Sequence, residues 1–426
     1  MWNKRLTLCV ALLALPLAAR TVPTAKPEDV GLSSERLQRI NQTVQRYIDD
    51  NQVSGAVTLV ARKGRIAHFA AQGLMDIESK KPMAKDAIFR LASSSKPITA
   101  LAIMMLVEEG KVRLTDPVSR FIPEFKDSKV AVAKPSAPAP GPPGQPPPAP
   151  EYYLVPANHD ITIRELLTHT SGLATRGGIT AREAAKVGQS RKPTDRLSDA
   201  IPRLGALPLD FQPGTKWQYS AGAAFGVLGR VVEVASNLPF DQFLRQRVFE
   251  PLGMKDTFFG VPADRASRLP TLYRRTAQGL ERSENQRGLS NDVYFSGASG
   301  LASTAEDYLQ YAQMLANGGQ LNGKRLLSPR TVELMFSNHV GDVVDLVTFQ
   351  SFNLGMGFGL GGSVVLDSVK GTGPRPNGSY GWDGVFGTHW WVDPKDKLIA
   401  ILWIQTPDYW ALARDFDNAV VQAVVD

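Results

Sequence analysis

Residues 89–97 read Phe-Arg-Leu-Ala-Ser-Ser-Ser-Lys-Pro, and this stretch decides how the rest of the chain is interpreted. The residues that follow, up to about Glu109, are apolar on nearly all sides of a helix, which predicts a buried helix that begins near Ser93. Residues three positions apart lie on the same face of a helix, so Lys96 should lie one turn beyond Ser93. The sequence therefore predicts a serine and a lysine side by side at the start of a buried helix.

This pair is a candidate for nucleophilic catalysis. A serine hydroxyl needs a base within hydrogen-bond reach before it can attack at neutral pH. A lysine can be that base only as a neutral amine, which burial and the positive N-terminus of a helix both favour. The same N-terminus presents backbone N–H groups, including that of Ser93, to a developing oxyanion. The alternative for this segment alone is that the serines at 93–95 only cap the helix and that Lys96 is solvated.

The segments around this helix predict a mixed fold. Helical and strand-like patterns alternate at both ends of the chain, whereas helical patterns dominate between about Ile161 and Asn317. The predicted fold class is α+β, with an antiparallel sheet flanked by N- and C-terminal helices and an inserted all-helical domain. The expected elements are a helix over 33–51, a hairpin of 55–62 and 65–72, helices over 223–234 and 305–317, strands over 388–392 and 398–404, and an amphipathic segment over 410–425.

Composition divides the chain further. The first 19 residues combine a short basic start with an apolar run too short to span a membrane, which is typical of a secretory signal peptide. We therefore expect an exported protein, periplasmic or secreted, that loses its single cysteine, Cys9, on cleavage. Nine prolines between 131 and 150 predict a surface excursion with polyproline II character. The predicted division is a signal peptide at 1–19, the first part of an α/β domain at 20–130, a Pro-rich surface insertion at 131–160, a helical domain at 161–325 and the second part of the α/β domain at 326–426.

Composition also argues against several classes of protein. The 48 Lys and Arg residues exceed the 41 Asp and Glu residues by only seven charges, without a dense basic block, so no nucleic-acid partner is expected. One cysteine and five scattered histidines, without an HExxH pair, argue against a Cys-rich zinc site, an iron–sulfur cluster and a zinc protease. A Gly-x-Gly-x-x-Gly match at Gly357, Gly359 and Gly362 has no strand–helix unit around it, so a glycine-rich strand beside a cleft explains it better than a dinucleotide site.

Four segments, in order, resemble one known family. Residues 89–97 are similar to the start of the active-site helix in the serine β-lactamase and penicillin-binding-protein superfamily, particularly its class C-like branch. The remaining three resemble further blocks of that branch: Ile-Thr-Ile-Arg-Glu-Leu-Leu-Thr-His-Thr-Ser-Gly-Leu at 161–173, Pro-Gly-Thr-Lys-Trp-Gln-Tyr-Ser at 213–220, and Phe-Ser-Gly-Ala-Ser-Gly-Leu-Ala-Ser-Thr-Ala-Glu-Asp at 295–307. The resemblance implies that Ser93 is the acylated nucleophile, Lys96 its proton partner and Tyr219 the third catalytic group. It also implies that His169, which would otherwise be a candidate base, is structural.

Two departures from the penicillin-active members indicate the substrate. Their Tyr-x-Asn motif has Ala221 at its third position here, which removes an amide that could hold a substrate amide. Their Lys- or His-Thr-Gly motif is matched by Trp382-Asp383-Gly384, and a tryptophan cannot bind a carboxylate as a lysine does. This Trp-x-Gly resembles the family VIII carboxylesterases.

That resemblance implies roles for the residues around the motif. Trp382 would form an apolar wall, Gly384 would let the strand pass close to the substrate, and the Val385 N–H would be the second oxyanion donor beside that of Ser93. Asp383 would be unfavourable near an oxyanion unless it points away, as alternation along a strand permits.

The sequence therefore predicts an exported serine hydrolase that cleaves carboxylic esters through an acyl-serine intermediate, with a small-molecule ester or amide as its substrate. This acyl-enzyme mechanism requires no metal or organic cofactor. A β-lactamase or D,D-peptidase acting on an amide, and an acyltransferase, remain alternatives on the same fold. A non-catalytic binding protein is a third class of alternative.

Overall fold

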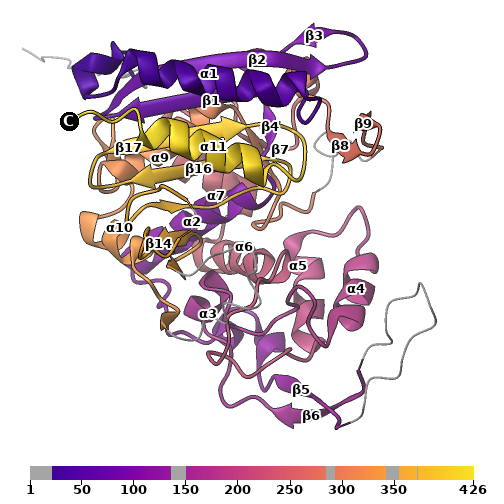
Figure 1. The fold of residues 1–426 in the computed structure, drawn as a ribbon. Helices are drawn as coiled ribbons and strands as arrows, with labels where there is room; N and C mark the ends of the chain where they lie inside the picture. The colour runs from indigo at the N-terminus through magenta and orange to yellow at the C-terminus, as the bar shows by residue number, and fades with distance from the viewer. Residues whose placement is uncertain (1–21, 136–149, 285–292, 342–354, 372) are drawn as a thin grey trace, which may run out of the picture.

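The computed structural model describes residues 22–135, 150–284, 293–341, 355–371 and 373–426 (Figure 1). The predicted signal peptide at 1–19 lies outside the described residues, so export stays a prediction. No helix in the described part of the chain combines the length and the apolar character needed to cross a membrane.

An eight-stranded sheet, antiparallel at every pairing, forms the centre of the α/β part. The first two strands form the predicted hairpin, and side chains alternate between the two faces of the sheet, so that Leu59 joins one apolar core and Val60 the other. The strands, in order across the sheet, are β13 (Met356–Phe358), β14 (Ser363–Val365), β15 (Tyr380–Gly381), β16 (Thr388–Asp393), β17 (Leu398–Trp403), β1 (Gly55–Arg62), β2 (Arg65–Asp76) and β3 (Lys81–Pro82).

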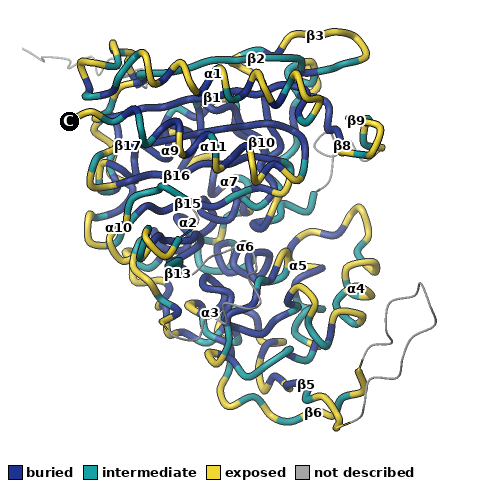
Figure 2. Tube along the Cα trace, viewed as in Figure 1, coloured by how far each residue is buried: buried dark blue, intermediate teal, exposed yellow. Residues whose placement is uncertain are grey.

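Helices cover both faces of this sheet, which is why β1, β16 and β17 are buried along their whole length (Figure 2). On one face α1 (Ser34–Asp49) packs beside α11 (Trp410–Val421), and on the other α9 (Ala305–Ala316) packs against β16, β17 and β1. The N- and C-terminal helices thus flank an antiparallel sheet, and the predicted fold class is confirmed.

A helical region lies beyond one edge of the sheet (Figure 1). The buried helix α2 (Lys96–Glu108) contacts α6 (Ala223–Ser236), the central helix of this region, so α2 connects the helical region to the α/β part. The predicted helical domain, residues 161–325, also includes α9, which the structure packs on the sheet instead. The helices of this region are α3 (Ile163–Leu167), α4 (Ala181–Gln189), α5 (Leu197–Ala200), α6 (Ala223–Ser236), α7 (Phe240–Leu244) and α8 (Glu250–Leu252), and α10 (Pro329–Phe336) follows α9.

Short strands complete the described structure. A three-stranded sheet joins β4 (Phe89–Arg90) to β10 (Leu301–Ser303) and β7 (Phe258–Phe259). Two small hairpins are formed by β8 (Tyr273–Thr276) with β9 (Gly279–Arg282) and by β11 (Gln320–Leu321) with β12 (Lys324–Arg325).

The flanks of the Pro-rich segment are more regular than expected. Where the sequence predicts a surface insertion over 131–160, β5 (Lys129–Ala133) and β6 (Tyr152–Pro156) form an antiparallel pair at the far end of the helical region (Figure 1). The central residues 136–149, with most of the prolines, lie outside the described residues, so their polyproline II character stays a prediction.

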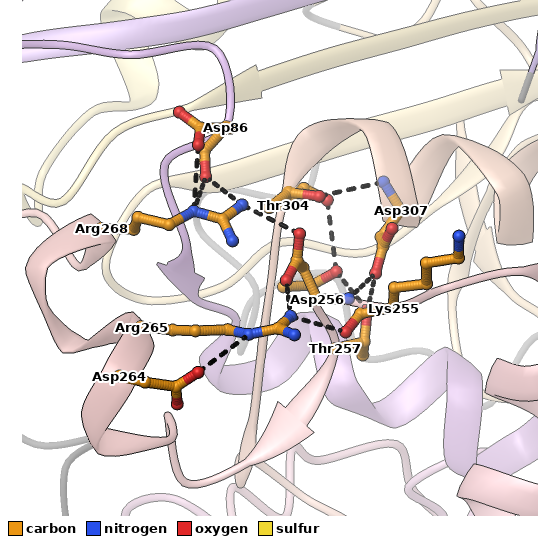
Figure 3. Close-up of polar contacts among 10 residues, drawn as sticks. Asp86, Lys255, Asp256, Thr257, Asp264, Arg265, Arg268, Thr304 and Asp307 are labelled. Atoms are coloured by element: carbon orange, nitrogen blue, oxygen red, sulfur yellow. Dashed lines mark hydrogen bonds and ion pairs between the residues drawn. The ribbon is translucent and has the colours of Figure 1, made fainter.

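A polar network attaches the segment around Asp256 to the start of α9 (Figure 3). Asp256 lies between Arg265 and Arg268 and forms an ion pair with each. The Asp307 carboxylate of α9 accepts hydrogen bonds from the Asp256 N–H (2.6 Å) and the Thr257 hydroxyl (3.0 Å). Burial raises the pKa of Asp307 to about 6, although these hydrogen bonds oppose the shift. The network therefore joins α9 to a segment that comes before it in the chain.

Candidate active site

Ser93 lies in a short 3-10 turn, Ala92–Ser95, that leads directly into α2. Ala92 has a φ of 46°, a left-handed conformation that side chains other than glycine rarely adopt. The turn is pinned by its neighbours, because the Tyr308 hydroxyl donates to the Ser94 carbonyl (2.8 Å) and the Leu301 N–H donates to the Ser95 hydroxyl (3.2 Å). Ser93 itself stays half-buried, with its hydroxyl at the start of the buried helix.

Lys96 is fully buried, and the predicted proximity to Ser93 is present: Lys96 Nζ lies 3.1 Å from Ser93 Oγ. Two backbone carbonyls complete its surroundings, those of Ala221 and Ala298, each 2.8 Å from Nζ. Burial lowers the pKa of Lys96, because the charged ammonium loses its hydration, and the nearby Tyr219 only partly opposes this. No carboxylate is bonded to this amine in the described residues. Its environment therefore favours the neutral form.

Tyr219 completes a compact group with the same serine. Its hydroxyl donates a hydrogen bond to Ser93 Oγ over 2.7 Å, and Lys96 Nζ lies 5.1 Å from the centre of its ring. The tyrosine comes from the loop before α6, which places it more than a hundred residues from Ser93 in the chain. The other two predicted catalytic residues, Lys96 and Tyr219, are therefore both within hydrogen-bond reach of Ser93 Oγ.

His169 lies behind Tyr219 rather than beside Ser93. The His169 ring is buried, and its centre lies 4.6 Å from the centre of the Tyr219 ring. Its Nδ1 accepts a hydrogen bond from the Ser220 N–H (3.2 Å). Burial lowers the pKa of His169 well below its usual value, and Lys96 adds to this shift. It has a φ of 59°, as a turn residue does. In the described structure His169 makes no hydrogen bond to Ser93, and it supports the ring of Tyr219.

The segment Trp382–Val385 connects β15 to β16 and runs beside the serine turn. Trp382 is 6% exposed and packs its ring 5.5 Å from that of Tyr219 and 5.1 Å from that of Phe358. It therefore places an aromatic ring next to Tyr219, at the position where the related motif would supply a cation. Its role as a wall of the substrate site stays a prediction.

Gly384 has a packing reason that the sequence did not predict. A Cβ atom at this position would lie 2.1 Å from both the Leu91 carbonyl oxygen and Thr388 Oγ1. The glycine therefore lets the segment approach the residues just before Ser93, and this contact with the protein requires it whether or not a substrate is present.

The two predicted oxyanion donors lie on either side of this close approach. Among the described residues, neither the Ser93 N–H nor the Val385 N–H donates to an acceptor in the chain. Val385 is 59% exposed, so this residue lies at the surface. The role of the two N–H groups as oxyanion donors stays a prediction.

Ser94 is a functional candidate that the sequence interpretation missed. Its buried hydroxyl lies 3.2 Å from the Trp382 carbonyl oxygen, 3.0 Å from that of Thr388 and 3.0 Å from Thr388 Oγ1. It thus fixes the distance between the serine turn and the Trp382–Val385 segment. In the sequence, only the position of Ser94 next to Ser93 could have indicated this role, because its partners Trp382 and Thr388 lie almost 300 residues further along the chain.

Asp383, which the sequence left unexplained, points away from the serine. Its carboxylate lies 2.7 Å from Nδ1 of His389, on the face of the sheet that α11 covers. Asp383 lies in the connection between β15 and β16, so alternation along a strand does not set its direction. In the described part of the chain, no three His, Cys, Asp or Glu side chains gather in a way that could hold a metal ion.

Comparison with known proteins identifies the family. The chain matches the β-lactamase family over residues 40–423. It is 37% identical over 371 residues to Protein Rv1367c of Mycobacterium tuberculosis, with 85% of this chain and 88% of that protein covered. It is 32% identical over 415 residues to esterase EstB of Burkholderia gladioli, with 91% and 94% covered.

A solved structure agrees with these relatives. EstCE1, described as a hydrolase with promiscuous acyltransferase activity, has a TM-score of 0.73 at 29% identity, with 91% of this chain and 98% of that chain covered. The chain therefore belongs to the β-lactamase family, and it is a serine hydrolase. The resemblance found in the sequence motifs is confirmed.

Proposed function

We propose that this serine hydrolase cleaves small, uncharged carboxylic esters through a covalent acyl-serine. The observation that carries the proposal is the contact of Ser93 Oγ with both a buried amine, at 3.1 Å, and a phenol, at 2.7 Å. The esterase relative EstB and the hydrolase EstCE1 support esters as the substrate class.

The surroundings of Lys96 explain how it can accept a proton. A neutral amine has two N–H donors and one lone pair. The carbonyls of Ala221 and Ala298 can take the two donors, which leaves the lone pair directed at the Ser93 hydroxyl. A charged ammonium would also satisfy three acceptors, but burial makes that form costly. We infer that Lys96 is the general base for Ser93.

The proposed reaction then follows the positions of these groups. Ser93 Oγ bonds to the ester carbonyl carbon while its proton passes to Lys96, and the carbonyl oxygen becomes an oxyanion held by the Ser93 and Val385 N–H groups. As the bond from carbon to the alcohol oxygen breaks, Tyr219 gives its proton to that oxygen and takes in its place the proton that Lys96 had accepted. Water then attacks the acyl carbon while one of its protons passes to Lys96 through Tyr219. The bond from that carbon to Ser93 Oγ breaks, Oγ takes this proton back, and the acid is released.

The walls of the site favour esters over β-lactams. Trp382 provides an aromatic surface with no cation for a substrate carboxylate, and Ala221 provides no side-chain amide. A panel of a short p-nitrophenyl ester and a chromogenic cephalosporin, measured as kcat/KM, tests this preference. A larger value for the cephalosporin would favour the β-lactamase alternative.

The central test is Ser93→Ala. The variant should lose ester turnover by at least roughly 1000-fold while keeping a melting temperature close to that of wild type, because it removes the nucleophile but only one oxygen atom of a half-buried residue. Wild type should be labelled at Ser93 by a fluorophosphonate, and the variant should not. Equal turnover by both proteins would refute the assignment, and absence of labelling in wild type would favour a non-catalytic protein.

Acyl transfer is a second candidate function, and the promiscuous acyltransferase activity in the description of EstCE1 favours testing it. Because Val385 is exposed, an alcohol could reach the acyl-serine in place of water. Adding an alcohol acceptor should then produce a new ester in a Ser93-dependent manner. Hydrolysis alone at high acceptor concentration would exclude this function.

Export is part of the same proposal and rests on residues 1–19. N-terminal sequencing of the protein recovered outside the cytoplasm should begin near residue 20. A sequence that begins at Met1 would refute it.

A further inference from the structure

A buried charged cluster lies behind the Trp382–Val385 segment. His389 of β16 is 3% exposed and lies between two carboxylates: Nδ1 is 2.7 Å from Asp383 and Nε2 is 2.8 Å from Asp417 of α11. Carboxylates only accept hydrogen bonds, so both ring nitrogens must carry a proton for both contacts to be made. The geometry therefore requires an imidazolium, a charged histidine, inside the protein.

The remaining members of the cluster balance its charge. Asp417 also accepts a hydrogen bond from the Trp391 indole N–H (2.7 Å) and has Arg375 at 3.5 Å. Two carboxylates thus face an imidazolium and a guanidinium, which makes the cluster neutral. Buried charges are tolerated only when they are paired and hydrogen-bonded in this way.

The titration of His389 agrees with this geometry. Burial alone would lower its pKa, but the Asp417 and Asp383 carboxylates outweigh burial and raise it to about 10. Burial also raises the pKa values of Tyr308 and Tyr409, the further titratable groups near Asp383, so both keep their protons. His389 therefore stays charged across the neutral range.

The cluster holds one face of the segment, and the serine turn holds the other. Asp383 follows Trp382 and comes two residues before Val385, so its position along the chain limits where both can lie. On the opposite face, Ser94 contacts the Trp382 carbonyl and Gly384 packs on the residue before Ala92. The segment that supplies the aromatic wall and one oxyanion donor is therefore held from two sides.

We propose that His389 is a positioning residue for the reaction, which through Asp383 fixes the Trp382–Val385 segment against the serine turn. The inference rests on the proposed function, because its effect is exerted on the Val385 N–H and on Trp382. A donor displaced by about 1 Å can cost about 100-fold in rate. Loss of the Asp383 contact should therefore act on kcat more than on KM, because the donor is used chiefly in the transition state.

Asp383→Ala is the variant of choice, because it leaves the buried His389–Asp417 pair in place. We expect kcat for the ester to fall about 10- to 100-fold with KM changed less than about threefold. Asp415→Ala is the matched control: it removes another aspartate of α11, paired with Arg46 of α1, without touching the segment, and should keep the wild-type kcat.

The same panel includes Ser93→Ala, which separates the two proposals. If Ser93→Ala is as active as wild type, the proposed function fails and the positioning role falls with it. If Ser93→Ala is inactive while Asp383→Ala keeps the wild-type kcat, only the positioning role is overturned. An equal loss of kcat in Asp383→Ala and Asp415→Ala would also overturn it, because general loosening of α11 would then explain both.

The charge of His389 can be measured in the absence of substrate. Nitrogen NMR of the imidazole groups at pH 8 should find one histidine with both ring nitrogens protonated, and Asp383→Asn should lower the pH at which it titrates, because that variant removes one of the two carboxylate charges. The same measurement on Ser93→Ala should be unchanged. A wild-type protein in which every histidine is neutral at pH 8 would overturn the inference.

Discussion

Gly384→Ala tests how closely the oxyanion segment must approach the nucleophile. The new Cβ atom would lie 2.1 Å from the Leu91 carbonyl oxygen and from Thr388 Oγ1, whereas real Cβ contacts essentially never fall below 3.0 Å. The distance between the Gly384 backbone and these two oxygens must therefore increase by roughly 1 Å. The Leu91 carbonyl has little freedom to move, because it belongs to the backbone just before Ser93. A shift of this size moves the Val385 N–H away from the oxyanion.

The expected result is a loss of about 100-fold in kcat with a smaller change in KM. Overpacking of this kind should also cost about 1–3 kcal/mol of unfolding free energy. Steady-state kinetics with a p-nitrophenyl ester and urea denaturation measure the two effects. Gly188→Ala in α4 is the control, because nothing lies near its Cβ position and the helix should tolerate or gain from alanine. Wild-type kcat in Gly384→Ala would refute the reasoning.

Two further predictions concern the proton path. Burial lowers the pKa of Lys96 below the usual lysine value, and only the neutral amine can accept the Ser93 proton. The kcat/KM for a neutral ester should therefore fall as the pH is lowered through this pKa. A kcat/KM that rises toward acid pH would contradict this. Tyr219→Phe should keep the ring contacts with His169 and Trp382 but reduce kcat by at least about 100-fold. Rapid-mixing measurements should assign this loss to the chemical steps, and wild-type kcat would remove Tyr219 from the mechanism.

The features predicted well from the sequence are those that short stretches of chain determine. The hairpin of β1 and β2 follows from two β-rich runs around Lys63-Gly64, and the proximity of Ser93 to Lys96 follows from helical spacing. Tyr219 was identified by family resemblance, because no periodicity connects a loop before α6 to the start of α2.

The features that the sequence did not predict depend on how distant segments dock. Asp383 contacts His389 of β16, and His389 in turn contacts Asp417 of α11. The register of β16 and the placement of α11 decide whether these groups meet. Similarly, the helical pattern of 305–317 does not indicate which surface the helix packs against, and α9 contacts β16, β17 and β1 of the sheet. Ser94 entered the sequence interpretation only in the alternative that the serines at 93–95 cap the helix, because its hydrogen-bond acceptors become known only with the fold.

The two carbonyl oxygens that hold the Lys96 amine come from separate segments, one before α6 and one before β10. An incompletely folded chain lacks this arrangement, so its lysine is hydrated and cationic and its serine is an ordinary alcohol. Chemical reactivity at position 93 should consequently emerge only in the last stage of assembly, and the rate at which a refolding sample becomes sensitive to an acylating reagent would time that stage directly.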